Sequence, residues 1–572
     1  MKLQAVDLAI IVLYNLVVLG MGIGFFRKTK TSDQFMAAGR NLPAWAVGLS
    51  IFGSYVSSIS FLANPGKAYG PSNWNAAIFA LIMPPTAWIA VRWFVPFYRH
   101  TGEVSAYTHL EHRFGAWART YAVICFLLTQ VMRLGMILYL LSMAMAPLFL
   151  GEDVAKAAPP AAQAAAVESA AAATTDVDAK AAKQAAERKQ QEKTELLTTL
   201  TIVLGIVVVV YPFLGGTEAV IWTGVLQALL LIAGALSCAA ALVFGMPEGP
   251  AQIFRIAAEA EPNKFSLGSY ELSVAASTVW VVMAYGIVEH LKNFGVDQAY
   301  VQRYITAKSD AAAKRSVWIG TVLFMPISLT FFFIGTALYA FYKVQPQLLP
   351  KGEFKTDDIF PHFIANELPT GVTGLVIAAI CAAAMDSNLN SCATLMLEDI
   401  YKRYIRPKAT EGESIWFLRA TTVALGVISI VTGIMCQEFK SALDAWWLLA
   451  GIFGGGVLGL ILLGLMSRKA GNLSGLIGVI CGILTILWMT VSIKLDDLLP
   501  WLQKKMSISD SLVGMLETIR SPLVFVDAGK NVPRIHELLI PVIGTAVVLL
   551  VGLVVAQFDR PVASPEPARE RA

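Results

Sequence analysis

Long runs of apolar residues recur along the whole chain, and short stretches rich in charge separate them. About thirteen of these runs approach the 20 residues that a helix needs to cross the apolar core of a bilayer. They lie near 7–26, 44–63, 74–96, 121–149, 197–214, 218–245, 273–293, 316–342, 370–396, 416–436, 443–466, 473–493 and 536–557. Strands of membrane barrels are much shorter and alternate in polarity. The pattern therefore predicts an all-α membrane protein with about thirteen transmembrane helices.

The composition supports this prediction. Of 572 residues, 56% are hydrophobic and 15% are charged, with a mean hydropathy of +0.62. Soluble domains carry about 25% charged residues. The net charge of +4 reflects the loops between the spans and indicates no nucleic-acid partner. The expected partner is the lipid bilayer.

Basic residues in the loops predict the orientation. They follow the first, third, seventh, ninth and eleventh runs, at Arg27, Lys28, Lys30, Arg40, Arg99, Arg113, Arg119, Arg303, Lys308, Lys314, Arg315, Lys402, Arg403, Arg406, Arg468 and Lys469. With an odd number of spans these loops share one side of the membrane, which the positive-inside rule places in the cytoplasm. We expect a multi-pass protein of a bacterial-type plasma membrane, with the N-terminus outside and the C-terminus cytoplasmic.

Residues 152–197 differ in composition from everything around them. Alanine, glutamine, lysine and glutamate dominate, and large apolar side chains are almost absent. A segment with nothing to bury is expected to be an external helical or disordered addition. A partner-docking arm is the alternative, although low-complexity composition rarely specifies a binding surface.

No motif for enzymatic chemistry stands out. The six cysteines lie in or at the ends of the apolar runs, without a CxxC pair or a histidine cluster, so neither disulfides nor metal sites are expected. The sequence has no nucleophile elbow and no P-loop. It predicts neither an enzyme nor a cofactor.

The second apolar run carries the first candidate site. Transporters bind their substrates where helices break in mid-membrane, because free backbone dipoles occur only there. Residues 64–66 read Asn-Pro-Gly, which predicts that the helix unwinds or stops at this point. Ser54, Ser57, Ser58 and Ser60 crowd the preceding turns. A single serine most often lets helices pack closely, but four beside a break favour a site.

The seventh apolar run is interrupted by polar residues between two glycines. These residues are Glu289, His290, Lys292 and Asn293, flanked by Gly286 and Gly295. The alternative is a helix end that reaches the cytoplasm, with Glu289 and Lys292 as an ion pair three residues apart. His290 and Asn293 lie one turn apart on one helix face, so we expect both in a pocket.

Two charged residues lie deep inside apolar runs. Arg133 is about a dozen residues from the end of its run, too deep to reach the interface, so it requires a carboxylate from another helix or from a ligand. Asp386 has no basic residue nearby, since Lys402 lies roughly four helical turns further on. A carboxylate there requires a cation, a proton or a partner, and a bond to Ser387 and Asn390 is the structural alternative.

Several motifs together resemble the sodium/solute symporter family. "SDQFMAAGRNLPAWAVGLS" is similar to the family's entry to the second span, and "YTHLEHRFG" to a loop that usually reads EyLxxRFG. "GGTEAVIWTGVLQ" resembles the signature GGxxAVxWTDxxQ. "DQAYVQRYITAKS" and "SCATLMLEDIYKRY" resemble two further family segments. The likeness covers Asp7 to about Arg468, interrupted by the 152–197 insert.

The resemblance implies a fold and a division of the chain. Ten core helices, here within 41–468, form two five-helix inverted repeats around a central site. The segment 1–40 then holds an extra transmembrane helix and a loop. The segment 469–557 holds two C-terminal helices, and 558–572 is a cytoplasmic tail.

The resemblance also implies a sodium site between the second and ninth spans. Its backbone ligands match Gly53, Val56 and Ile380, but its two hydroxyl positions are Ala383 and Ala384 here. The aspartate of WTDxxQ, which holds a second sodium in some members, is Gly224. The hydroxyl partners of that aspartate match Asp386 and Ser387, so a carboxylate appears on the ninth span where it should face the sixth. We therefore expect Asp386 and Ser387 to bind the coupling cation.

The substrate pocket is also carried over by resemblance. Its positions match Ser57, Ser60, Phe79, Arg133, His290, Asn293 and Trp447. Arg133 matches the arginine that grips the substrate carboxylate in sialic-acid transporters, and the two serines fit the same branch. The sodium/galactose branch has polar sugar-binding groups where this chain has Ser60, Ala80 and Trp447, which weakens a neutral hexose. Trp446 and Trp447 fit stacking on a sugar but also ordinary interface anchors.

These observations predict a sodium-coupled symporter that imports a small organic solute, a sugar or an acidic sugar such as sialic acid. A proton-coupled or uncoupled carrier is the alternative, because both usual ion sites are altered. A membrane sensor is a weaker alternative, because about 15 residues follow the last run and leave no room for a kinase.

Overall fold

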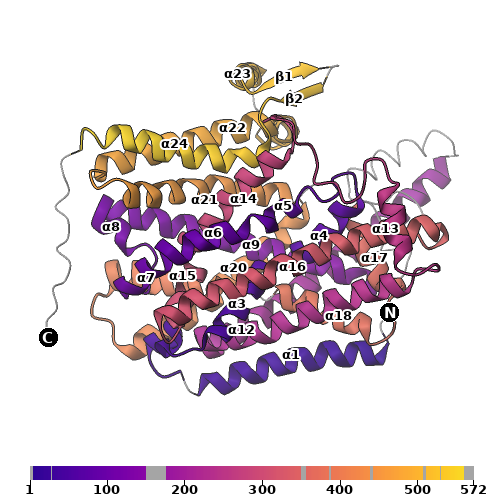
Figure 1. The fold of residues 1–572 in the computed structure, drawn as a ribbon, viewed down its shortest axis with the longest axis horizontal. Coiled ribbons are helices and arrows are strands. Elements are labelled where there is room, and N and C mark those ends of the chain that lie inside the picture. The colour runs from indigo at the N-terminus through magenta and orange to yellow at the C-terminus, as the bar shows by residue number, and fades with distance from the viewer. Residues whose placement is uncertain are drawn as a thin grey trace.

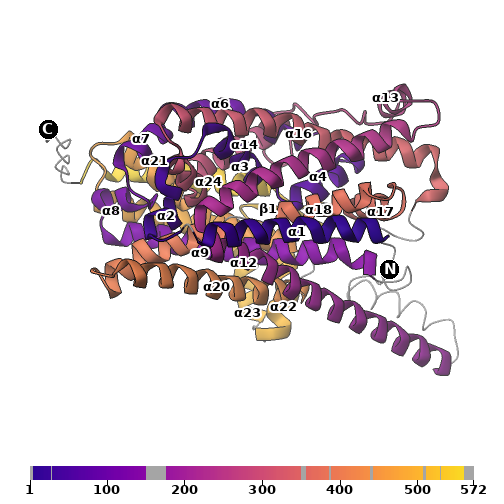
Figure 2. The same cartoon turned by 90° about the horizontal axis from the view of Figure 1, so that it is seen from below.

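The computed structural model describes residues 4–27, 29–149, 176–349, 356–384, 388–438, 442–506, 510–527 and 530–559. Most of the long helices run along the longest axis of the molecule (Figures 1 and 2). The helices are α1 (Ala5–Phe26), α2 (Ser32–Ala37), α3 (Ala44–Tyr55), α4 (Ser58–Tyr69), α5 (Ala77–Leu81), α6 (Met83–Ile89), α7 (Val95–Thr101), α8 (Thr108–Phe114), α9 (Ala116–Phe149), α12 (Asp176–Phe244), α13 (Ala251–Ala258), α14 (Val279–Gly295), α15 (Gln298–Thr306), α16 (Asp310–Val344), α17 (Ile359–Asn366), α18 (Val372–Ala384), α19 (Asn388–Leu395), α20 (Glu411–Met435), α21 (Ala442–Met466), α22 (Asn472–Met506), α23 (Asp510–Arg520) and α24 (Ile540–Val555). The strands are β1 (Val524–Asp527) and β2 (Lys530–Pro533).

The helical membrane architecture is confirmed, but the expected number of spans is not. Within the described ranges, nine helices are long and apolar enough to cross a membrane, or up to ten if the bent pair α3 and α4 counts as one. One reason is that α12 joins two expected spans in a single 69-residue element. Another is that α14 has only 17 residues, which is short for a span.

The two halves of α12 meet at Gly216. This residue has φ 58° and ψ −152°, a conformation that glycine alone adopts without strain, and a β-carbon there would lie 2.7 Å from the carbonyl oxygen of Phe35. Before the kink, α12 begins inside the expected 152–197 insert. Figure 2 shows this first part projecting away from the bundle. Residues 150–175 lie outside the described residues.

The first helix is tied to the helix that carries the expected cation site. Asp7 of α1 is buried, and its Oδ1 accepts hydrogen bonds from the amides of Gly371 (2.7 Å) and Gly374 (2.8 Å). These amides belong to the amino-terminal turn of α18, where backbone donors lack partners within the helix. Asp7 thus caps α18 from a neighbouring helix, and its charge also favours this end of the helix dipole.

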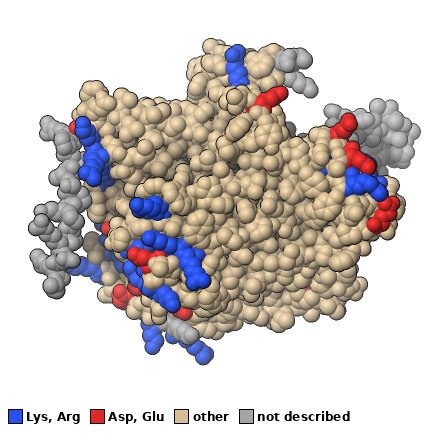
Figure 3. Space-filling model, viewed as in Figure 1, with Lys and Arg blue, Asp and Glu red and all other residues tan. Residues whose placement is uncertain are grey.

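Ion pairs between the ends of helices hold the end of the bundle where the basic residues gather. Arg99 pairs with Asp310 at 2.8 Å and donates to the carbonyls that end α15. Arg119 bridges Asp399 and Glu111, and Arg403 also pairs with Glu111. In the face shown in Figure 3, charged side chains gather toward the ends, with a wide uncharged surface between them. This distribution fits a protein whose middle faces lipid.

A small structure that the sequence did not predict follows α22. Helix α23 leads into the antiparallel hairpin β1–β2, in which Phe525 faces Val532 and Val526 faces Asn531. Leu523 and Val524 pack with Ile486 of α22 in one cluster. The hairpin returns to the bundle where the amide of His536 donates to the carbonyl of Val274 at 2.7 Å.

Replacing Asp7 should destabilise the protein measurably. Asp7→Ala leaves two buried amides without an acceptor, so we expect a loss of about 1–3 kcal/mol in unfolding free energy. Asp7→Asn retains one acceptor oxygen but loses the charge, so its loss should be smaller. Thermal unfolding in detergent measures both variants. Equal melting temperatures for Asp7→Ala and the wild type would show that water replaces the carboxylate at no cost.

Candidate functional site

The candidate site is built around a break between α3 and α4. Helix α3 ends at Tyr55, and Val56 (φ −88°, ψ 98°) and Ser57 (φ −90°, ψ 166°) are extended before α4 begins. The two helices are bent by 53° relative to each other. Ser57 caps α4, because its Oγ accepts from the amide of Ser60 at 3.4 Å. Its Oγ also lies 3.4 Å from the Ser60 Oγ, so the structure brings these two predicted residues together.

The prediction that the helix breaks at 64–66 was wrong. Pro65 lies inside α4, which continues to Tyr69. The reason is tertiary packing: Gly335 of α16 lies directly against the carbonyl of Pro65, so a neighbouring helix covers the weakened turn. The carboxyl end of α4 is capped by Lys264, whose Nζ donates to the carbonyls of Tyr69 and Gly70 at 2.8 Å each. Burial lowers the pKa of Lys264 from its ordinary value.

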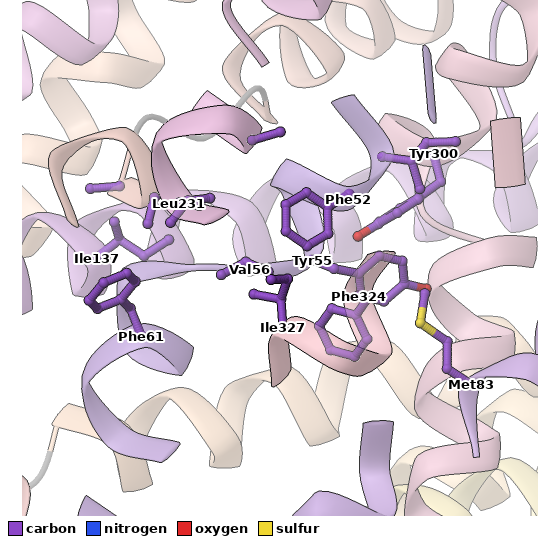
Figure 4. Packing of buried hydrophobic residues seen from close by; sticks show 14 of the residues in the cluster. Phe52, Tyr55, Val56, Phe61, Met83, Ile137, Leu231, Tyr300, Phe324 and Ile327 are labelled. Atoms are coloured by element: carbon purple, nitrogen blue, oxygen red, sulfur yellow. The ribbon is translucent and has the colours of Figure 1, made fainter. Parts of the chain in front are cut away.

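A small cavity of about 10 Å³, which is room for roughly one water molecule, opens beside the break. Five helices supply its lining: α3, the second half of α12, α9, α15 and α18. The lining residues are Ser50, Gly53, Ser54, Val56, Ser57, Arg133, Val220, Gly224, Gln227, Arg303 and Ala383. Figure 4 shows the aromatic packing around the same turn, with Tyr55 against Phe324 and Tyr300.

The cavity contains the backbone groups from which a cation can take ligands. The carbonyls in the last turn of α3 have no amide partner further along that helix, and the helix dipole makes this end partly negative. Gly53 and Val56 of this turn line the cavity with Ala383 of α18. Ile380 is buried on α18, three residues before Ala383. The structure thus brings Gly53 and Val56 together and places Ile380 on the adjoining helix.

Arg303 was expected in a cytoplasmic loop, and this expectation was wrong. It lies on α15, is 3% exposed and lines the cavity. Its Nε donates to Ser50 Oγ at 3.1 Å, and its Nη2 donates to Ser54 Oγ at 2.5 Å. Counting loop charges missed this residue because the short helix α15 folds back into the bundle. Its place in the "DQAYVQRY" motif was the signal that pointed to a role other than topology.

Arg133 reaches the same cavity from α9. It is half-buried, and its Nη2 lies 3.5 Å from the carbonyl oxygen of Ser54. Two guanidinium groups therefore line one space inside the bundle. The prediction that Arg133 faces an internal site is consistent with this position.

Phe79 and His290 contact each other, and neither is among the residues that line the cavity. The Nε2 of His290 is 2.8 Å from the carbonyl oxygen of Phe79, and the two rings are 4.2 Å apart between centroids. The ring centroid of Tyr55, the last residue of α3, lies 5.8 Å from that of His290. Tyr55 thus connects this pair to the break. Helix α14 is continuous through the expected interruption and ends at Gly295. Glu289 and Lys292 form the alternative ion pair at 2.6 Å.

The structure describes the remaining predicted site residues only in part. Asn293 is half-buried on α14, three residues from His290. Trp447 belongs to α21, but its side chain lies outside the described part of the structure. Asp386 and Ser387 also lie outside the described residues, between α18 and α19.

A buried polar network near the break was not predicted from the sequence. Gln302 of α15 donates through Nε2 to the Met36 carbonyl (2.5 Å), Thr217 Oγ1 (3.1 Å) and Thr394 Oγ1 (3.0 Å). Ser391 of α19 donates to Gln302 Oε1 at 2.8 Å. The network joins four helices, α2, α12, α15 and α19. No local pattern could reveal it, because its members are far apart in sequence.

Helices bundled along one axis, a break inside one of them and a lined cavity at that break define a membrane transporter. The profile of the Sodium:solute symporter family matches residues 35–145 and 193–482. The chain belongs to this family, which confirms the resemblance seen in its motifs. Its family and relatives are transporters, and it is a multi-pass plasma-membrane protein.

Similar proteins share the length as well as the family. A sodium/sialic acid symporter of Proteus mirabilis is 30% identical over 487 residues, covering 84% of this chain and 89% of its own. A sodium/sialic acid symporter of Aliivibrio fischeri is 29% identical over 484 residues, covering 84% and 86%. A solved structure described as the substrate-bound, outward-open state of a Na⁺-coupled sialic acid symporter matches with a TM-score of 0.77. It is 27% identical and covers 98% of this chain and 99% of its own.

The position of Gly224 gives a test of the cavity. A β-carbon there would lie 2.9 Å from Ser50 Oγ, so α12 and α3 are in close contact at this point. Gly224→Ala should push Ser50 away from Arg303 and lower transport activity severalfold, with a modest loss of stability. Gly20→Ala on α1 is the matched control, because a β-carbon at Gly20 meets nothing within 4 Å. Initial uptake rates in proteoliposomes measure the effect; equal rates for both variants would exclude this contact from function.

Proposed function

We propose that this protein imports an acidic sugar together with sodium. One observation carries the proposal: a guanidinium group, Arg133, and the carbonyl end of a broken helix, at Gly53 and Val56, line the same cavity. The first can hold a carboxylate, and the second can hold a cation. The two bacterial relatives named above as sodium/sialic acid symporters support the choice of an acidic sugar.

The substrate carboxylate is proposed to bind Arg133, with hydroxyl groups of the sugar near Ser57 and Ser60. Guanidinium groups bind carboxylates through two parallel hydrogen bonds, which fixes the orientation of the ligand. Phe79, His290, Asn293 and Trp447 remain proposed substrate contacts. Phe79, His290 and Asn293 do not line the described cavity, so we propose that they meet the sugar in another conformation of the alternating-access cycle.

The coupling sodium ion is proposed to bind the carbonyls of Gly53, Val56 and Ile380. Ala383 and Ala384 supply no hydroxyl oxygens, so the site needs other ligands, for which we propose Asp386 and Ser387. A proton-coupled carrier is the second candidate, because the same two alanines leave a carboxylate as the expected ion ligand. The two candidates differ in whether the Asp386 carboxylate binds sodium or a proton.

The orientation is also a proposal. The loops that hold Arg99, Arg119 and Arg403 are placed in the cytoplasm by the positive-inside rule. Asp559, which follows α24, accepts hydrogen bonds from the amides of Gly471 and Ser474, so this end of α24 lies beside the Arg468–Lys469 loop. Helix α1 then begins on the outer side.

Arg133→Lys tests the substrate assignment. Lysine keeps the charge but cannot form two parallel bonds, so binding of acidic sugars should weaken by about 1–3 kcal/mol, which is roughly 5- to 150-fold. Binding of neutral analogues should not change. Arg92→Lys is the control, since Arg92 is exposed beside Trp93. Competition against labelled sialic acid measures both; a neutral solute transported normally by Arg133→Lys would refute the assignment.

Asp386→Asn tests the coupling ion. The change removes a charge with little change in shape, so the half-saturating sodium concentration should rise about tenfold or more, or sodium dependence should disappear. In the wild type, sodium and protons should compete, so apparent sodium affinity should fall as the pH falls. Ser387→Ala, which removes a neutral ligand beside it, should have a smaller effect.

Uptake into proteoliposomes under sodium, lithium or proton gradients separates the outcomes. Wild-type uptake that follows the proton gradient alone supports the proton-coupled carrier. An unchanged sodium requirement in Asp386→Asn would mean that the ion sits on backbone carbonyls without this carboxylate.

A further inference from the structure

The structure between α22 and α24 buries one charged side chain and exposes several large apolar ones. Helix α23 buries Arg520, whose side chain is 5% exposed and pairs with Asp496 (2.8 Å) and Glu517 (2.9 Å). Asn531 of β2 donates to the same Asp496 at 3.0 Å. Large apolar residues are exposed instead: Met515 (55%), Ile519 (40%), Phe525 (40%) and Val526 (71%). Water disfavours a patch of this kind, so another medium is expected to cover it.

The exposed residues continue the lipid-facing side of α22. Ile480, Leu484 and Trp488 lie four residues apart along that helix and are all exposed. The Trp488 Nε1 donates to the carbonyl of Ile519 at 3.0 Å, which attaches the end of α23 to this stripe. Trp488 precedes Asp496 by eight residues, or about 12 Å along a helix. The carboxyl end of α23 therefore lies at the level of the last turns of the span.

The direction of α23 agrees with this position. In Figure 1 the spanning helices run across the picture, whereas α23 is seen end-on, so its axis lies across theirs. The hairpin and α23 project sideways beside α22 and α24. A helix with this direction, at the end of a span and with an apolar outer side, has the geometry of an interfacial membrane helix.

We propose that α23 and β1 form an interfacial anchor that rests in the lipid leaflet at this end of α22. Met515, Ile519 and Val526 face the boundary between phospholipid headgroups and acyl chains, while Arg520 is held by Asp496 and Glu517. The occupant of the patch is thus the phospholipid bilayer, continuous with the lipid that already covers Leu484 and Trp488. The anchor would restrain the α22–α24 pair relative to the membrane plane.

Site-specific labelling tests this inference in the intact transporter. Single cysteines are introduced as Met515→Cys and Val526→Cys in a Cys481→Ser background, because the other five cysteines are buried. Gly514→Cys is the matched control, since it lies on the flank of α23 and a β-carbon there meets nothing within 4 Å. Each variant carries a nitrobenzoxadiazole label in phosphatidylcholine nanodiscs that hold one transporter.

Labels at 515 and 526 should be quenched severalfold more by spin-labelled phosphatidylcholine than the label at 514, and severalfold less by aqueous iodide. Equal iodide quenching at all three positions would overturn the proposal. A second outcome would also overturn the proposal. If the labels are protected from iodide only when two transporters share a nanodisc, and the spin-labelled lipid does not quench them, a second copy of the transporter covers the patch. Two independent label sites keep the test valid if one variant folds poorly.

Discussion

The requirement that buried backbone groups find partners inside a membrane shapes this protein more than any other constraint. Most of the chain meets it with continuous helices, in which each carbonyl bonds an amide four residues on. The break at Val56 and Ser57 leaves the carbonyls of one turn without such amides. A partly negative helix end is thereby exposed to an internal cavity. The proposed cation ligands Gly53 and Val56, the cavity and the bend between α3 and α4 all depend on this one interruption.

Close packing around the break fixes the geometry of the cavity. Gly53 lies so near the Gly224 carbonyl that a β-carbon would be 3.3 Å from its oxygen, which sets the distance between α3 and α12. Arg303 then ties α15 to α3 through Ser50 and Ser54. These contacts hold α3, α15 and α12 together around the cavity. The same residues that line the cavity thus couple its walls.

The sequence predicted those features that depend on local pattern or on motifs. Apolar runs located the helices. The motif resemblance assigned Gly53 and Val56 to a cation site and Ser57 and Arg133 to a substrate pocket, and all four line the described cavity. The break was predicted eight residues too late, because proline and glycine describe local propensity while Gly335 stabilises that turn from another helix. Arg303 and Gln302 were missed for a similar reason, since only the fold of α15 turns their side chains inward. Local sequence patterns could not predict the residues whose position depends on contacts between distant helices.

The two proposed sites lie in one cavity, and this explains why substrate and ion would bind together. Arg133 is the proposed partner of the substrate carboxylate, and the carbonyl end of α3 is the proposed partner of sodium. Opposite charges held in one buried space are weakly screened, so a bound carboxylate would favour sodium and sodium would favour the carboxylate. Each ligand then raises the affinity for the other by the same factor, as linkage requires. An anionic substrate and a cation in one cavity can thus be coupled without any direct contact between the two.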